Sequence, residues 1–253
     1  MGSLESKVAV ITGAASGIGL ATARLFMSEG ASIAAVDIDE KALANSVDDL
    51  SRGGTIVAIA GDVTKVADAE GILERAVAAF GRVDILFSNA GISSVTPILD
   101  LEEEEWDRVI TTNLRSMFAM VKAVARHMRS IGGGTIVTTG SESGLVGVAE
   151  TPAYCASKGG VVLFTKAVAL DLIRYNIRVN CLCPGITRTP LLQAEADNSP
   201  DPELAARMFA DWAPIGRIAD PNEIAKAALF LASEASSFAV GSCLIVDGGN
   251  TAR

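Results

Sequence analysis

A tyrosine and a lysine four residues apart, Tyr154 and Lys158, could form a reactive pair in this chain. On a helix, this spacing places both side chains on one face. A nearby ammonium group favours the ionised form of a phenol, whose ordinary pKa is about 10, so Tyr154 could accept a proton near neutral pH. Upstream, Ser141 follows an apolar, strand-like run, and its hydroxyl could hold a substrate oxygen. Alone, the tyrosine–lysine spacing is more typical of an amphipathic surface pair.

A glycine-rich turn follows the first apolar run of the chain. Residues 7–12 are predicted to form a buried strand, and a helical pattern begins directly after the turn. In this setting, glycines let backbone N–H groups at the start of a helix approach a pyrophosphate. The alternative is a tight structural turn between a strand and a helix. The candidate contacts in the turn are Gly13, Ser16, Gly17, Ile18 and Gly19.

A second predicted strand, residues 31–36, ends at an acid that strengthens the dinucleotide interpretation. Asp37 lies 18 residues beyond Gly19, where a dinucleotide site needs a carboxylate for the ribose hydroxyls. A helix-capping acid is the alternative. Strand, glycine turn and acid together predict a dinucleotide site that includes Asp37 and its neighbour Ile38.

The alternation of strands and helices continues to the end of the chain. Further strands are predicted at residues 55–60, 83–87, 134–139, 177–183 and 244–247. In an open parallel sheet, ligands bind at the carboxyl ends of the strands. Asp62, Val63, Asn89, Ala90 and Gly91 follow two of these strands and are therefore candidate cofactor neighbours. Without a linker, the pattern predicts one α/β domain over residues 1–253 with a doubly wound parallel sheet.

A long helix is predicted over residues 100–130. Asp100 as N-cap and Glu103 three residues later resemble a capping box. The acidic run 102–105 suits the positive end of a helix dipole, so we interpret it as structural and not as a metal site. Asn113 interrupts the apolar stripe of this helix. A buried amide needs partners, so Asn113 either makes a bond between helices or belongs to a site.

Residues 188–213 form a segment with a lid-like composition. Apolar side chains alternate there with acids and with Pro190, Pro200 and Pro202. The segment is expected to form short mobile helices over the rim of the sheet, with a packed insertion as the alternative.

The composition of the chain limits the classes of partner and the cellular location that are expected. The net charge of −9 argues against a nucleic-acid partner, which requires a basic face. No run of about 18 uncharged apolar residues is present, so no membrane span is expected. Residues 1–7 lack the apolar core of a signal peptide. A cytoplasmic location is therefore expected.

The cysteines and the single histidine offer little catalytic chemistry. Alternation places the thiols of Cys181 and Cys183 on one face of a strand, and buried reduced thiols are expected there, without a metal. A Ser-His-Asp triad would have to use His127, which lies between arginines on an amphipathic pattern and is expected at the surface.

The motifs occur together in an order and spacing that strongly resemble the short-chain dehydrogenase/reductase family. They are the glycine turn, Asn89-Ala90-Gly91, Asn113, Ser141, Tyr154-x-x-x-Lys158 and Pro184-Gly185. The resemblance covers essentially the whole chain. It implies a single-domain Rossmann fold with a seven-stranded parallel sheet and helices on both faces, a nicotinamide cofactor and a homotetramer.

The resemblance also implies roles for individual residues. Tyr154 would be the general acid/base, and Lys158 its electrostatic partner and a ligand of the ribose. Ser141 would orient the substrate oxygen, and Asn113 would support a water that links Lys158 to solvent. The nicotinamide end of the cofactor would contact Pro184, Gly185, Ile186, Thr187 and Thr189.

NAD is the expected cofactor because Asp37 would repel the 2′-phosphate of NADP and the turn offers no basic residue. A largely apolar secondary alcohol or ketone is the expected substrate. Its pocket could be lined by Leu145, Val146, Val148, Leu191, Leu192, Met208, Phe209 and Trp212. Glu142, next to Ser141, could contact substrate or face water. The alternatives are a reductase of 3-oxoacyl thioesters and a non-catalytic dinucleotide sensor.

Overall fold

The computed structural model describes residues 2–51, 53–199 and 201–252. Seven parallel strands form one sheet in the order β3-β2-β1-β4-β5-β6-β7. The strands are β1 (Val8–Thr12), β2 (Ser32–Asp37), β3 (Ile56–Ala60), β4 (Ile85–Ser88), β5 (Gly134–Thr139), β6 (Ile177–Pro184) and β7 (Cys243–Val246). The predicted α/β fold with a doubly wound, seven-stranded parallel sheet is therefore confirmed.

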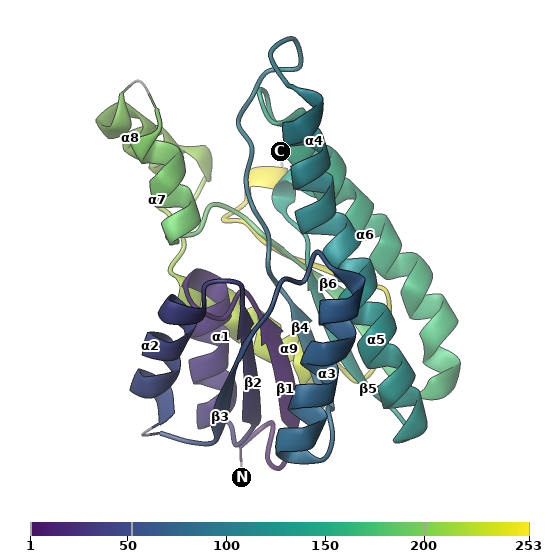
Figure 1. Cartoon of the computed structure of the whole chain (residues 1–253). Coiled ribbons are helices and arrows are strands. Elements are labelled where there is room, and N and C mark those ends of the chain that lie inside the picture. The colour runs from purple at the N-terminus through teal and green to yellow at the C-terminus, as the bar shows by residue number, and fades with distance from the viewer. Residues whose placement is uncertain (1, 52, 200, 253) are drawn as a thin grey trace.

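Helices cover both faces of this sheet (Figure 1). One face carries α1, α2 and α9, and the other carries α3, α5 and α6. The helices are α1 (Gly17–Ser28), α2 (Glu40–Ser51), α3 (Val66–Phe80), α4 (Glu103–Ile110), α5 (Ser116–Ser130), α6 (Pro152–Leu172), α7 (Pro190–Asp197), α8 (Pro202–Trp212) and α9 (Pro221–Ala232). Because helices pack on both faces, the central strands read as continuous apolar runs.

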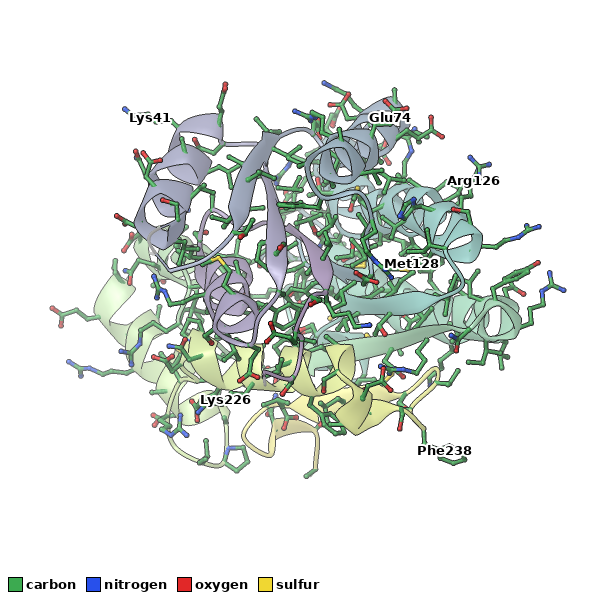
Figure 2. All side chains as sticks on the ribbon, turned by 90° about the horizontal axis from the view of Figure 1, so that it is seen from below. Lys41, Glu74, Arg126, Met128, Lys226 and Phe238 are labelled. Carbon is green, nitrogen blue, oxygen red and sulfur yellow. The ribbon has the colours of Figure 1, made fainter. Side chains whose placement is uncertain are left out.

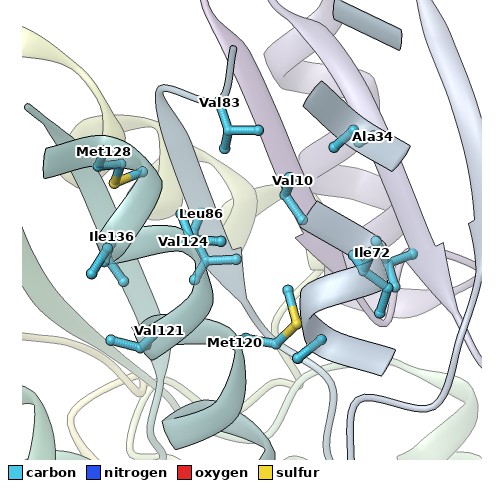
Figure 3. Close-up of a cluster of buried hydrophobic side chains, with 14 of the residues drawn as sticks. Val10, Ala34, Ile72, Val83, Leu86, Met120, Val121, Val124, Met128 and Ile136 are labelled. Atoms are coloured by element: carbon cyan, nitrogen blue, oxygen red, sulfur yellow. The ribbon is translucent and has the colours of Figure 1, made fainter. Parts of the chain in front are cut away.

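The core between the sheet and the α3–α5 layer is made of aliphatic and methionine side chains. Met120 and Val124 of α5 pack with Val10 of β1 and Leu86 of β4 (Figure 3). Seen from below, Met128 of the same helix lies inside, whereas charged side chains such as Arg126 extend outward (Figure 2). The 3.6-residue period of α5 therefore separates its core face from its solvent face.

The order of the strands determines where a ligand can bind. The chain moves outward in one direction through β1, β2 and β3, and then returns to pair β4 with the other side of β1. Ligands of open α/β sheets bind at the carboxyl ends of the strands beside such a reversal. Helices α7 and α8 stand above this edge (Figure 1).

The predicted helix over residues 100–130 is wrong at its start and in its regularity. Helix α4 begins at Glu103 with Glu102 as N-cap, and no side-chain capping bond is made. Asp100 lies in the preceding turn, so the expected capping box does not form. Residues Thr111–Arg115 form a π-helical turn between α4 and α5. π-Helical turns of this kind occur mostly as single turns inside α-helices, often at functional sites.

The structure bears on the predicted lid, residues 188–213, and on the expectation that no segment spans a membrane. The predicted lid segment contains two short helices, α7 and α8; Pro200 lies outside the described residues. In the described part of the chain, no helix combines the length and apolar character needed to cross a membrane.

Candidate active site

A cleft of about 800 Å³ opens at the carboxyl edge of the sheet. It is lined by the glycine turn, the ends of β2, β4 and β5, the start of α6, the segment after β6, and α7 and α8. Every residue predicted for catalysis or cofactor binding lines this cleft except Gly19 and Asn113. These two lie behind the lining, and each has a structural task described below.

The glycine turn is built for close backbone approach. Gly13 has φ +69°, and a Cβ on it would lie 3.1 Å from the Cα of Ala90. A Cβ on Gly19 would collide with the carbonyl oxygen of Gly13, so Gly19 allows α1 to pack against the turn. Ser16 is the N-cap of α1 and makes no side-chain capping bond. The helix start is therefore available to bind an anion such as a pyrophosphate.

Asp37 is held in place at the end of β2. Its two carboxylate oxygens accept backbone N–H bonds from Ala15 (3.0 Å) and Asp39 (3.1 Å). The Ala15 bond fixes the carboxylate against the glycine turn, as recognition of a ribose diol would require. Of the residues lining the cleft, the cations are Arg108 and Lys158, and neither belongs to the glycine turn or the end of β2. The Asp37 end of the cleft lining therefore offers no cation for a 2′-phosphate.

Asp62, at the end of β3, also lines the cleft. Bonds from the Thr64 hydroxyl (2.7 Å) and Thr64 N–H (3.0 Å) help to hold the Asp62 pKa below its ordinary value. At the end of β4, the Asn89 side chain donates to the Thr12 carbonyl (3.1 Å), which ties the two strand ends together.

The two hydroxyls of the predicted reactive group meet in this cleft. Helix α6 begins at Pro152 and presents Tyr154 in its first turn, where the phenol hydrogen-bonds Ser141. The backbone N–H of Ser143 donates to Ser141 Oγ (3.2 Å). Since that oxygen already accepts a bond, the Ser141 O–H is available to donate to the phenol or to a substrate oxygen.

Lys158 lies one helical turn beyond Tyr154 and is buried. Its Nζ donates to the Thr139 carbonyl oxygen (2.9 Å) and lies 5.7 Å from the centre of the Tyr154 ring. Burial lowers the pKa of Lys158 to about 8. The amine is therefore still mostly protonated at neutral pH.

The pKa of Tyr154 differs from the expectation of a lowered value. Burial raises it to about 12, against a smaller lowering by the Ser141 hydrogen bond, and the charges of Glu195 and Glu142 raise it further. In the free protein, desolvation of the phenolate therefore outweighs the effect of the lysine. At neutral pH Tyr154 holds its proton.

Asn113, in the π-helical turn, is fully buried and positions its neighbours. Its Oδ1 accepts the N–H of Ile92 (2.8 Å), and its Nδ2 donates to the carbonyl of Ile92 (2.9 Å) and to Ser157 Oγ (3.0 Å). It thus joins the loop after β4 to α6 beside Lys158, rather than only joining two helices. The water that the family resemblance implies for Asn113 stays a prediction.

Three acids line the side of the cleft away from the glycine turn: Glu142, Glu150 and Glu195. Glu142 follows Ser141 and is 4% exposed, so it does not face bulk water. Glu195, on α7, was not among the predicted site residues, although it follows Leu191 and Leu192 at spacings of four and three that share one helix face.

The apolar lining is smaller than the sequence suggests. Of the eight apolar candidates, five line the cleft: Val148, Leu191, Leu192, Phe209 and Trp212. Leu145, Val146 and Met208 do not line it, and each is more than a third exposed.

Three of the four cysteines form a cluster away from the cleft lining. All four are free, and the sulfurs of Cys181 and Cys183 are buried and 3.7 Å apart, on the same face as expected. Cys243 on β7 completes a group with all three sulfurs within 4.8 Å of one another.

His127 is half-buried, which corrects the expected surface position. Its Nε2 accepts the backbone N–H of Val83 (3.1 Å), just before β4, and burial lowers its pKa. It therefore lies near the amino ends of the strands, at the edge opposite the cleft.

Comparisons with known proteins agree with this geometry. Residues 13–251 match the family model described as enoyl-(acyl carrier protein) reductase. The chain is 42% identical to cyclopentanol dehydrogenase of Comamonas testosteroni, with both chains covered completely. It is 41% identical to cis-4-hydroxycyclohexanecarboxylate dehydrogenase of Sinomonas cyclohexanicum over 97% of each chain. A crystal structure of a short-chain type dehydrogenase/reductase from Mycobacterium marinum superposes with a TM-score of 0.93 at 38% identity, covering 99% and 97% of the two chains.

Proposed function

The chain belongs to the short-chain dehydrogenase/reductase family, and we propose that it is an NAD-dependent enzyme that interconverts a secondary alcohol and its ketone. The convergence of Tyr154, Ser141 and Lys158 in one cleft carries this proposal. The other half of the cleft holds the glycine turn and Asp37, which suit a dinucleotide. The names of the cyclopentanol and hydroxycyclohexanecarboxylate dehydrogenases among its relatives support an alcohol as substrate.

The residues present fit a nicotinamide dinucleotide. The uncapped start of α1 would bind the pyrophosphate, Asp37 the adenosine ribose, and Lys158 the nicotinamide ribose. Beyond β6, the nicotinamide would contact the segment 184–189, where the Thr187 hydroxyl donates to the Gly185 carbonyl (2.9 Å). When bound, the cofactor supplies the hydride chemistry.

Side chains of the protein would transfer the proton to and from the substrate oxygen. In the reductive direction, the protonated phenol of Tyr154 donates to the ketone oxygen while Ser141 hydrogen-bonds the same oxygen. In the oxidative direction, the phenol must first ionise, and the Lys158 ammonium favours the phenolate. Positioning in the closed cleft supplies much of the remaining rate enhancement.

NAD is preferred over NADP in this proposal because of Asp37. Its carboxylate would meet the 2′-phosphate of NADP, and like charges in contact cost several kcal/mol. The cations that line the cleft, Arg108 and Lys158, are not at that end. The proposal includes a cytoplasmic location, which the four free thiols fit.

The test compares NAD and NADP with a panel of cyclic, aromatic, steroid and sugar alcohols and with acetoacetyl-CoA. We expect alcohol oxidation with NAD at a clearly higher kcat/KM than with NADP. Asp37→Ala should narrow this preference. Equal kcat/KM values for the two cofactors in the wild type would contradict the role of Asp37.

The family model's description favours a second candidate, a reductase of acyl thioesters. Such an enzyme would usually need a 2′-phosphate pocket and a basic face for an acidic carrier, and this chain has Asp37 and a net charge of −9. Faster reduction of acetoacetyl-CoA than of the ketones that correspond to the panel alcohols would favour it. A dinucleotide sensor would bind NAD and turn over none of these substrates.

A further inference from the structure

Two acids, the buried Glu142 and the half-buried Glu195, flank the reactive hydroxyls in the substrate half of the cleft. Glu142 comes from the turn after β5, and Glu195 comes from α7 above the rim. Both line the same cleft as Tyr154, and their negative charges raise the pKa of its phenol. A substrate whose oxygen lies at Tyr154 and Ser141 therefore has both carboxyl groups near the rest of its structure.

These acids are incompletely compensated by the protein. Neither carboxyl forms an ion pair among the described residues, and the hydrogen-bonding neighbours of Glu142, Asn250 and Trp212, are neutral. Glu195 is hydrogen-bonded to Ser93. Burial raises the pKa of both acids, that of Glu142 to about 7. A desolvated carboxylate without a cation is costly, and a ligand that brings a hydrogen-bond donor or a positive charge reduces that cost.

The charges lining the substrate half are mainly negative. Glu142, Glu150 and Glu195 line this half together with two cations, Arg108 and Lys158, and Lys158 lies beside Tyr154. An anionic substituent would therefore be repelled, whereas a hydroxyl or ammonium group would be attracted. A plain hydrocarbon ring would leave the two carboxyl groups against CH₂ groups.

Building on the function proposed above, we infer that Glu142 and Glu195 determine substrate specificity. The cleft is adapted to a secondary alcohol that carries a second hydrogen-bond donor, a hydroxyl or an ammonium group, near the carbinol carbon. Val148, Leu192 and Phe209 pack on the carbon skeleton of such a substrate. The substrate is then less apolar than the sequence suggests.

The test measures kcat/KM with NAD for four cyclic alcohols. They are cyclohexanol, 1,2-cyclohexanediol, 2-aminocyclohexanol and 4-hydroxycyclohexanecarboxylate. The wild type should prefer the diol or the amino alcohol over cyclohexanol by about tenfold or more, since a site built to hydrogen-bond a substrate group rejects the analogue that lacks it. The carboxylate should be the poorest substrate.

Glutamine variants test whether Glu142 and Glu195 set this preference and whether the substrate donor is a hydroxyl or an ammonium group. Glu142→Gln and Glu195→Gln should each reduce the preference for the amino alcohol and improve turnover of the carboxylate, because they remove a negative charge. The preference for the diol over cyclohexanol should fall less, since a glutamine carbonyl still accepts a hydrogen bond. Glu203→Gln is the matched control: it removes the same charge from the neighbouring helix α8, at a side chain that is 88% exposed, and should leave every ratio unchanged.

The outcomes separate this inference from the function on which it rests. Turnover of all four alcohols with cyclohexanol as the best substrate overturns the inference and leaves the proposed function standing. The inference is also overturned if the kcat/KM ratios between the four alcohols are the same in both glutamine variants as in the wild type. Failure to oxidise any alcohol with either cofactor overturns both.

Discussion

At the scale of single residues, the state of one proton on Tyr154 separates the two reaction directions. Tyr154 is half-buried, desolvation raises the pKa of its phenol to about 12, and Lys158 is the cation of the described cleft lining beside its ring. The free protein therefore stores the proton that reduction of a ketone would use. Oxidation needs a further influence that favours the phenolate, and the positive ring of oxidised nicotinamide would supply it.

Ultraviolet titration of the phenol tests this explanation directly, because the chain contains only two tyrosines, Tyr154 and Tyr175. Adding NAD⁺ at moderately alkaline pH should increase the absorbance of ionised tyrosine in the wild type. Tyr154→Phe should abolish the increase while keeping its affinity for NAD, and its turnover should fall by about 10²–10⁴-fold. A variant that still oxidises alcohol at nearly the wild-type rate would remove Tyr154 from the mechanism.

Lys158→Ala should be about as damaging to turnover as Tyr154→Phe. It should also weaken NAD binding, since the variant loses a ribose contact in addition to the charge near the phenol. Fluorescence titration with NAD measures this second effect. A Lys158→Ala protein with unchanged NAD affinity would limit the lysine to an electrostatic role.

Glu142 should make the stability of the protein depend on pH. Its folded pKa of about 7 lies above the value of 4.5 expected in the unfolded chain. Its contribution is therefore fully present below about pH 4.5 and is lost as pH rises through about 7, up to about 2–3 kcal/mol. Glu142→Gln removes this loss, so its melting temperature should exceed that of the wild type by several degrees at about pH 8 and by little at about pH 5.

Calorimetry at both pH values checks this expectation. Glu203→Gln, at an exposed side chain, should show no such pH-dependent difference. A Glu142→Gln protein that is less stable than the wild type at the higher pH would mean that the hydrogen bonds from Asn250 and Trp212 outweigh desolvation.

At the scale of elements, some parts of the fold could be predicted from sequence and others could not. The strands were predictable because buried parallel strands are short apolar runs that end in glycine or polar residues. The cofactor half was predictable because backbone geometry there requires glycine, as at Gly13. In the substrate half, Glu195 could not be predicted, because it reaches the cleft lining only through the packing of α7.

The start of α4 is a second feature that could not be predicted from the sequence. Local patterning favoured Asp100 as the N-cap, whereas Glu102 occupies that position in the structure. In the structure, Glu105 accepts hydrogen bonds from the hydroxyls of Ser94 (2.8 Å) and Thr96 (3.0 Å). These contacts lie 9 to 11 residues away in sequence and help to place the helix.

The mobility of α7 and α8 is a prediction about elements. Helix α8 has no buried residue among those described, and its Leu204 and Met208 are more than half exposed. A helix with so few packed apolar contacts should open easily. Hydrogen exchange in residues 188–213 should therefore be fast in the free protein and should slow when NAD and a substrate analogue bind. High protection that ligands do not change would show a packed insertion instead.

At the scale of the whole molecule, two exposed apolar surfaces suggest an assembly. On α6, Leu163 and Leu170 are 69% and 76% exposed, beside a groove shared by α5 and α6 that includes Phe118. At the β7 edge of the sheet, Phe238 before β7 is completely exposed and extends outward in Figure 2, and Ile245 of β7 is 43% exposed. Apolar surfaces of this kind commonly mark interfaces between subunits.

We predict a homotetramer in which each of these surfaces meets its own copy across a two-fold axis. Light scattering of the wild type should give four chain masses. Leu170→Glu would place a charge in the α5–α6 interface, and Phe238→Glu would do so in the β7 interface, so each should leave dimers, and the double variant monomers. Because both side chains are exposed in the single chain, these changes should not unfold it. Leu99→Glu, at an equally exposed leucine outside both surfaces, should remain tetrameric, and a monomeric wild type at micromolar concentration would refute the assembly.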